Sequence, residues 1–206
     1  MIVGRDEEWI SAVALLDRLA TGPCALFVEG EPGIGKTTIF EALVARARGL
    51  GVQVLRCRPS QAQVRLPHAG LMEVLDGIGA DLIDDLPGPQ RRAMRIALRW
   101  EDPGPLGAEP QTVAAATGSV FQRLARDRWL LLAVDDLQWL DDASAQALEY
   151  AVRRVEGGHL AVLGAARSAE GRARGPWSRP SLPTVWSACC CGGWTSRPSA
   201  CCCAGA

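Results

Sequence analysis

A glycine-rich stretch that contains the chain's single lysine is the first feature whose residue types could do chemistry. It has the sequence GEPGIGKT over residues 30–37. Glycines at this spacing let backbone N–H groups curl around phosphate oxygens, and the amino end of a following helix adds partial positive charge. We expect Lys36 to reach the terminal phosphates of a nucleotide and Thr37 to ligate magnesium. The loop predicts nucleotide contacts from Gly30, Gly33, Gly35, Lys36, Thr37 and Thr38.

The retention of Lys36 strengthens this interpretation. Among the 22 basic residues it is the only lysine, and asparagine is absent, a bias typical of GC-rich coding sequence. Such a bias replaces every exchangeable lysine by arginine. A flexible point charge is not interchangeable with a planar guanidinium where a phosphate must be reached. A phosphate-binding loop is therefore favoured over an ordinary glycine-rich turn.

The second chemical feature is a pair of acids that follows an apolar run, LLLAVDD at residues 130–136. A buried strand that ends in carboxylates would place Asp135 to hold magnesium, usually through water, and Asp136 to polarise an attacking water. Two acids after a strand are also common in turns and helix caps. The phosphate-binding pattern upstream favours the catalytic interpretation, with Lys36 and Asp136 as the catalytic pair.

The hydrophobic pattern supplies the elements that must position these residues. Helices are expected over residues 8–19, 36–48, 67–86, 90–100, 112–126 and from Asp141 or Asp142 to about 155, and strands over 25–28, 52–57, 129–134 and 160–165. Strands that alternate with helices imply a parallel sheet with right-handed crossovers. Ligands of such α/β proteins bind beyond the carboxyl ends of the strands, where both motifs would lie.

Composition limits the class of protein. The chain has 206 residues, is 48% hydrophobic and carries a net charge of −1. It can bury a substantial core, while a polyanion-binding surface and a membrane span are not indicated. The first ten residues, MIVGRDEEWI, carry acids where a secretory signal needs a basic and then an apolar stretch. We therefore expect a cytoplasmic protein.

The composition changes abruptly near residue 170. Residues 171–206 contain no acid, yet they hold six of the eight cysteines, in two CCC triplets, and three of the seven tryptophans. Adjacent cysteines do not suit the separated pairs that surround a structural zinc ion. A frameshift explains more, because repeated TGC codons in a shifted frame become CTG codons for leucine. We expect residues 1–170 to form the core and residues 171–206 to be an irregular, disordered tail.

Three segments together resemble a known family. VGRDEE at residues 3–8, GEPGIGKTT and above all VDDLQWLDDAS resemble the ATPase domain of the large LuxR-type transcriptional regulators, within the signal-transducing P-loop ATPases of the AAA class. The resemblance covers residues 2–170. It implies an AAA-like three-layer α/β sandwich with a mainly parallel sheet, and ATP with Mg²⁺ as ligands. It also implies that Gly4 and Arg5 lie beside the adenine, and it matches Gln138, Trp139 and Asp141 to the family string.

The segment LAVLGAAR at residues 160–167 resembles the family's fourth strand, which commonly ends in Thr-x-Arg. Ala165 occupies the threonine position, and Arg167 is retained. The resemblance implies that Arg167 contacts the terminal phosphate. A solvated arginine just beyond the strand is the equal alternative.

The resemblance also implies elements that this sequence does not show. A family member would continue with a fifth strand, a helical lid with a second arginine sensor, helical repeats and a DNA-binding helix-turn-helix. We therefore expect a sheet that is incomplete at its C-terminal edge and ATP hydrolysis that is weak or lost, since hydrolysis depends on lid closure.

The function expected is that of an ATP-binding regulatory module. Its expected partners are a nucleotide and, as the resemblance allows, a second copy through the ATPase domain. Direct DNA binding is not expected, because residues 1–170 carry a net charge of −5 and no helix-turn-helix is legible. A stand-alone small P-loop ATPase or kinase and a non-functional fragment are the alternatives.

Overall fold

The computed structural model describes residues 13, 16, 24–105, 107–155, 159–167 and 187–194. Its elements, in chain order, are β1 (Cys24–Gly30), α2 (Lys36–Gly49), β2 (Gln53–Cys57), α3 (Ala69–Val74), α4 (Ala80–Asp84), α5 (Gly88–Ala97), α6 (Pro110–Asp127), β3 (Leu130–Val134), the 3-10 helix η1 (Leu137–Trp139), α7 (Asp142–Arg154), β4 (Leu160–Arg167) and β5 (Ser187–Trp194).

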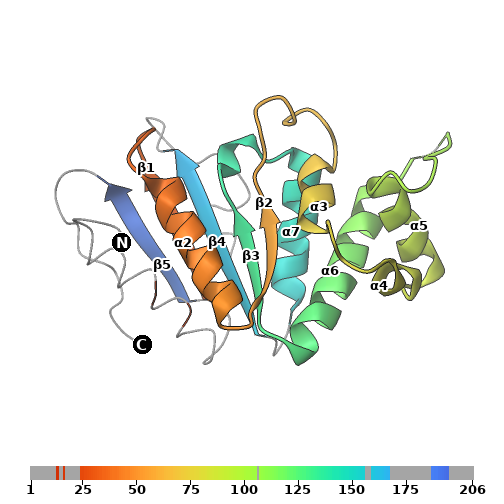
Figure 1. The fold of residues 1–206 in the computed structure, drawn as a ribbon. Coiled ribbons are helices and arrows are strands. Elements are labelled where there is room, and N and C mark those ends of the chain that lie inside the picture. The colour runs from red at the N-terminus through yellow and green to blue at the C-terminus, as the bar shows by residue number, and fades with distance from the viewer. Residues whose placement is uncertain are drawn as a thin grey trace.

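The five strands form one sheet in the order β2-β3-β4-β1-β5, and every pair of neighbours is parallel (Figure 1). The register pairs Val134 of β3 with Gly164 of β4, and Gly30 of β1 with Arg167 of β4. Strand β4 therefore extends beyond the last paired residue of β3 and ends level with β1. This topology confirms the expected α/β fold with a parallel sheet.

The strands bury both of their faces. In β3, Leu130, Leu132 and Val134 belong to one hydrophobic cluster, while Leu131 and Ala133 belong to another. Successive side chains of a strand point to opposite faces, so an uninterrupted apolar run such as β3 needs helices on both sides. Helix α2 covers one face, and α3 to α7 lie on the other (Figure 1). The three-layer arrangement follows.

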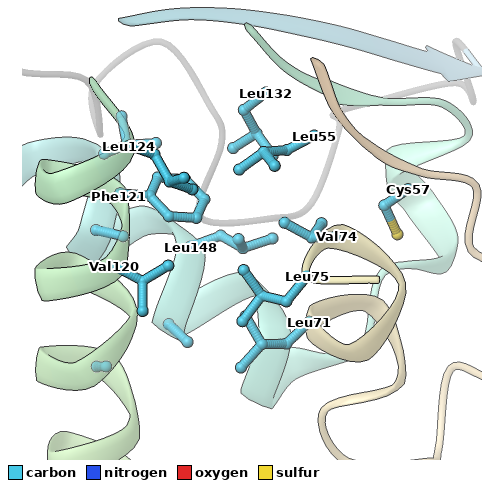
Figure 2. Packing of buried hydrophobic residues seen from close by; sticks show 14 of the residues in the cluster. Leu55, Cys57, Leu71, Val74, Leu75, Val120, Phe121, Leu124, Leu132 and Leu148 are labelled. Carbon is cyan, nitrogen blue, oxygen red and sulfur yellow. The ribbon is translucent and has the colours of Figure 1, made fainter. Parts of the chain in front are cut away.

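The larger cluster lies between the sheet and helices α3, α6 and α7. Figure 2 shows Leu55 and Leu132 from the sheet above Phe121 of α6, Leu148 of α7 and Val74 of α3. Phe121 and Leu148 have no exposed surface. Burying one such side chain contributes about 1.5–3 kcal/mol, so this cluster is the main stabilising feature of that face.

One expected helix is divided. Residues 67–86 form two short helices, α3 and α4, separated by a turn around Gly77, whose φ is 76°. The apolar spacing continues through the turn, but α3 ends at Val74, and the left-handed backbone of Gly77 turns the chain before α4 begins at Ala80. The other expected elements within the described residues agree to within three residues at each end. Of the helix expected over residues 8–19, Val13 and Leu16 are described, and both are helical.

The segment beyond residue 170 contains a strand that we did not expect. Ser187–Trp194 forms β5, with Leu26 of β1 opposite Cys189 and Val28 opposite Cys191. Its composition indicated an irregular tail, but strand pairing uses backbone N–H and C=O groups, which every residue except proline carries in full. We expected a sheet that is incomplete at its C-terminal edge, and in the structure β5 lies beside β1 at one end of the strand order. The division at residue 170 and the frameshift stay predictions.

No helix among the described residues is both long and apolar enough to cross a membrane.

Gly164 gives a test of the packing between β4 and η1. A Cβ atom at this position would lie 2.6 Å from Cδ1 of Phe27 and 2.6 Å from Cδ1 of Leu137. Gly164→Ala is expected to lower the free energy of unfolding by about 1–3 kcal/mol in urea denaturation, because the packed neighbours must shift. The matched control is Gly49→Ala in α2, where no atom lies within 4 Å. Equal stability of the two variants would contradict this packing.

Candidate functional site

The loop between β1 and α2 has the backbone geometry of an anion cradle. Gly33 and Gly35 have φ values of 80° and 95°, a left-handed region that costs most other residues about 1–2 kcal/mol. Gly35 is also the N-cap of α2 and supplies no side-chain acceptor for the first amides of the helix. The Thr38 N–H donates to the Gly35 carbonyl at 3.1 Å, so the amides of Lys36 and Thr37 are the ones that an anion can use at the positive end of the helix.

Lys36 is folded back over this loop. Its Nζ donates to the carbonyl oxygens of Gly30 at 2.9 Å and Glu31 at 2.8 Å, and the residue is 8% exposed. Burial is the main factor that lowers the pKa of Lys36; Asp136 opposes this shift, Arg167 adds to it, and Asp135 opposes it. The ammonium is thus held beside the cradle by carbonyls that a phosphate can replace.

Asp135 is a buried carboxylate with an unused oxygen. Its Oδ1 accepts from the Asp136 N–H at 3.0 Å, whereas its buried Oδ2 has no hydrogen-bond partner, and the Arg58 Nε lies 3.7 Å away. Burial raises the pKa of Asp135, the charge of Asp136 raises it further, and the Asp136 N–H, Arg58 and the Thr37 hydroxyl lower it. The Thr37 side chain is therefore close to the Asp135 carboxylate.

These two side chains fit magnesium. Mg²⁺ takes hard oxygen ligands, typically one or two from protein, and keeps waters or phosphate oxygens for the rest. A threonine hydroxyl and an unsatisfied carboxylate oxygen match that preference. In the described part of the chain no group of three or more His, Cys, Asp or Glu side chains could enclose a metal ion. A cation here would depend on oxygens of a bound phosphate.

Asp136, Gln138 and Arg167 form a second cluster next to Asp135. Asp136 lies in the left-handed region with φ 50°, and its Oδ1 accepts from Gln138 Nε2 at 2.7 Å. Arg167 Nε lies 3.5 Å from the same oxygen, and the Arg167 backbone N–H donates to Gln138 Oε1 at 3.1 Å. The Arg167 side chain is 48% exposed. It is partly solvated, and it also faces the acidic pair.

The tertiary structure brings most of the predicted site residues to one edge of the sheet. The loop with Lys36 and Thr37 follows β1, the acidic pair follows β3, and Arg167 ends β4 between them. Thr38 is exposed in the first turn of α2. Arg5 and Gly4 lie outside the described residues.

Arg58 is a site residue that the sequence analysis missed. It directly follows β2 and forms the ion pair with Asp135. Its backbone N–H donates to Glu73 Oε1 at 2.9 Å, and the Cys57 thiol donates to Glu73 Oε2 at 3.4 Å. These contacts fix the end of β2 against α3. A basic residue after a strand that ends at the same edge as Asp135 was the available signal.

Asp141 has a larger role than the expected helix cap. Its Oδ1 accepts from the Ser144 N–H at 2.9 Å, which caps α7. The carboxylate also accepts from the backbone N–H groups of His68 at 2.9 Å and Gly70 at 3.0 Å, and the residue is 3% exposed. A single buried carboxylate therefore holds the start of α3 against the start of α7.

A cleft of about 670 Å³ lies away from these residues, between α5, α6 and α7. Glutamines and prolines dominate its lining, which includes Gln90, Gln111, Gln146 and Tyr150. It contains none of the predicted site residues, most of which lie at the carboxyl ends of the strands.

Comparisons with known proteins agree with this geometry. A family model described as AAA ATPase domain matches residues 2–163. No curated protein matches the chain.

Solved structures with similar coordinates include two proteins of Aeropyrum pernix. Its ORC1 protein in complex with DNA is 22% identical with a TM-score of 0.46, over 91% of this chain and 45% of that one. Its ORC2 protein in ADPNP–ADP complexes is 17% identical with a TM-score of 0.45, over 82% and 42%. Drosophila ORC bound to AT-rich DNA and Cdc6 is 16% identical with a TM-score of 0.48, over 92% and 57%. The chain thus spans less than two thirds of each of these structures.

The Asp141 contacts predict a large effect on stability. Asp141→Ala is expected to lower the free energy of unfolding by about 3 kcal/mol, since three backbone donors lose their charged acceptor. The control is Asp142→Ala, an exposed acid in the first turn of α7, with an expected loss below about 1 kcal/mol. Urea denaturation of both variants measures this difference. A similar loss of stability in both would refute the role of Asp141 in holding α3 against α7.

The burial of Asp135 predicts that this residue lowers the stability of the fold to a degree that depends on pH. Its pKa is higher in the folded than in the unfolded chain, so its charge destabilises the fold above the folded-state pKa and has no effect well below the unfolded-state pKa. Asp135→Asn is therefore expected to raise the thermal midpoint at pH 8 without magnesium, with a gain that shrinks as the pH falls towards about 4. The exposed Asp76→Asn is the control. A gain that is constant with pH would contradict this assignment.

Proposed function

We propose that this chain, which belongs to the AAA ATPase domain family, is a regulatory module. It binds Mg-ATP and changes conformation with nucleotide state. One observation carries the proposal. The Lys36 ammonium, the Thr37 hydroxyl and the buried, unbonded Asp135 Oδ2 lie at one sheet edge beside a glycine loop with left-handed backbone. A nucleotide phosphate with its magnesium ion uses all of them.

Each residue of the loop then has a defined role. The amides of Gly33, Gly35, Lys36 and Thr37 hold phosphate oxygens. Lys36 exchanges the carbonyls of Gly30 and Glu31 for the terminal phosphates. Thr37 and Asp135 hold the magnesium ion, which neutralises charge that develops on the phosphates. Arg5 is proposed to lie beside the adenine.

Asp136 and Arg167 are proposed to act on the terminal phosphate. Asp136 orients and polarises the attacking water, and Arg167 contacts the phosphate from the end of β4. Turnover is proposed to be slow. The polar partner that usually precedes the arginine is replaced by Ala165, and hydrolysis in this family depends on lid closure.

The string VDDLQWLDDAS supports a place for this module within a large LuxR-type transcriptional regulator. In that setting the nucleotide state would control self-association through the ATPase domain, while DNA is bound elsewhere in the regulator. The proposal assigns no direct DNA contact to the described residues.

Lys36→Ala tests nucleotide binding. The dissociation constant for Mg-ATP, measured by calorimetry, is expected to rise at least about tenfold, or 1.4 kcal/mol, because the ammonium that faces the phosphates is lost. Arg46→Ala is the control, since it removes an exposed cation from the last turn of the same helix. Unchanged binding by Lys36→Ala would refute the proposed function, as would wild-type protein that does not bind Mg-ATP.

A further inference from the structure

Gln138 links two parts of the site that come from different strands. Its Nε2 donates to Asp136 Oδ1 at 2.7 Å, and its Oε1 accepts from the Arg167 backbone N–H at 3.1 Å. Asp136 follows β3, whereas Arg167 ends β4. One side chain thus joins the carboxylate to the strand end that carries the arginine.

Both contacts together require a side chain that ends in a donor and an acceptor, as the carboxamide of Gln138 does. A carboxamide donates through nitrogen and accepts through oxygen, whereas a carboxylate at neutral pH only accepts and a thioether has no N–H or O–H donor. Glutamate at position 138 would keep an acceptor for the Arg167 N–H but would repel Asp136. Methionine would fill a similar volume and lose both contacts.

Asp136 needs such support. Its φ of 50° is in the left-handed region, which aspartate adopts less readily than glycine. The Arg167 side chain is a weak restraint, since its Nε is 3.5 Å away and the side chain is 48% exposed. The short bond from Gln138 is the stronger contact on the Asp136 carboxylate.

The helix that carries Gln138 is itself fixed to β4. Leu137 lies over Gly164, where an added Cβ would meet the Leu137 Cδ1 at 2.6 Å. The Trp139 N–H donates to the Asp136 carbonyl at 2.9 Å, which begins η1. Leu137 and Gln138 therefore attach η1 to β4 at two successive residues, and a shift of β4 would move the Asp136 carboxylate with it.

We infer that Gln138 is a positioning residue for ATP hydrolysis, which holds the Asp136 carboxylate in place and ties it to the phosphate-contacting end of β4. This inference rests on the proposed function, because it assigns Asp136 to the attacking water. Gln138 acts through Asp136 and does not bind the nucleotide, so its loss should lower kcat and leave ATP affinity intact.

Two substitutions separate the contacts. Gln138→Met removes both hydrogen bonds, and Gln138→Glu keeps only the acceptor for Arg167. Steady-state hydrolysis of radiolabelled Mg-ATP is expected to show kcat lowered about 10- to 100-fold in both variants. KM and the affinities for Mg-ATP and ADP should stay within about twofold of wild type. The matched controls Gln146→Met and Gln146→Glu, at an exposed position of α7, should keep wild-type turnover.

Amide hydrogen exchange gives a readout that does not depend on turnover. The Arg167 amide is expected to exchange faster in Gln138→Met, which loses its acceptor, and at the wild-type rate in Gln138→Glu. A merely structural role would instead lower the thermal midpoint and weaken nucleotide binding together with kcat.

The outcomes distinguish this inference from the proposed function. Turnover of Gln138→Met within twofold of wild type, or loss of ATP affinity together with kcat, would overturn the positioning role alone. Wild-type protein that binds Mg-ATP but releases no phosphate would also overturn it while nucleotide binding stands. Wild-type protein that does not bind Mg-ATP would overturn both.

Discussion

The parallel hydrogen-bonded register of β1, β4 and β3 is the constraint on which the site depends. It places Gly30 opposite Arg167 and Val134 opposite Gly164. The glycine loop after β1, Arg167 and the acidic pair must therefore lie together at the carboxyl ends of the strands, because each directly follows or ends its strand. The absence of a side chain at Gly164 serves this arrangement, since it lets the Phe27 ring and Leu137 approach β4 closely on the same face.

Two charged side chains at the carboxyl ends of the strands, Lys36 and Asp135, are buried. Asp135 has a buried oxygen without a hydrogen bond, and Lys36 satisfies its ammonium with carbonyls of its own loop. Isolated polar groups in such places cost stability unless they are paired. A polyphosphate with its cation would supply further partners to both groups. Binding at such a site would stabilise the fold by mass action.

The segment from Asp135 to Asp141 contains candidate site residues and also residues that join elements of the fold. Asp135 and Asp136 lie near Lys36 and Thr37 at the end of the glycine loop. Gln138 joins η1 to β4, and Asp141 holds the start of α3 against the start of α7. Displacements of the acidic pair and of the helical layer are therefore linked through seven consecutive residues.

The sequence by itself determined the α/β class and most element boundaries, because loop glycines and apolar runs act through local backbone preferences. It also predicted the site from GEPGIGKT and LLLAVDD. It also limited the role of Asp141 to a cap and gave none to Arg58, whose contacts cross between elements far apart in the chain. The division of α3 from α4, the pairing of β5 with β1 and the bridge made by Gln138 were decided by the tertiary structure. The physical reason is that strand pairing and side-chain hydrogen bonds depend on which groups face one another in space, and composition and spacing do not specify that.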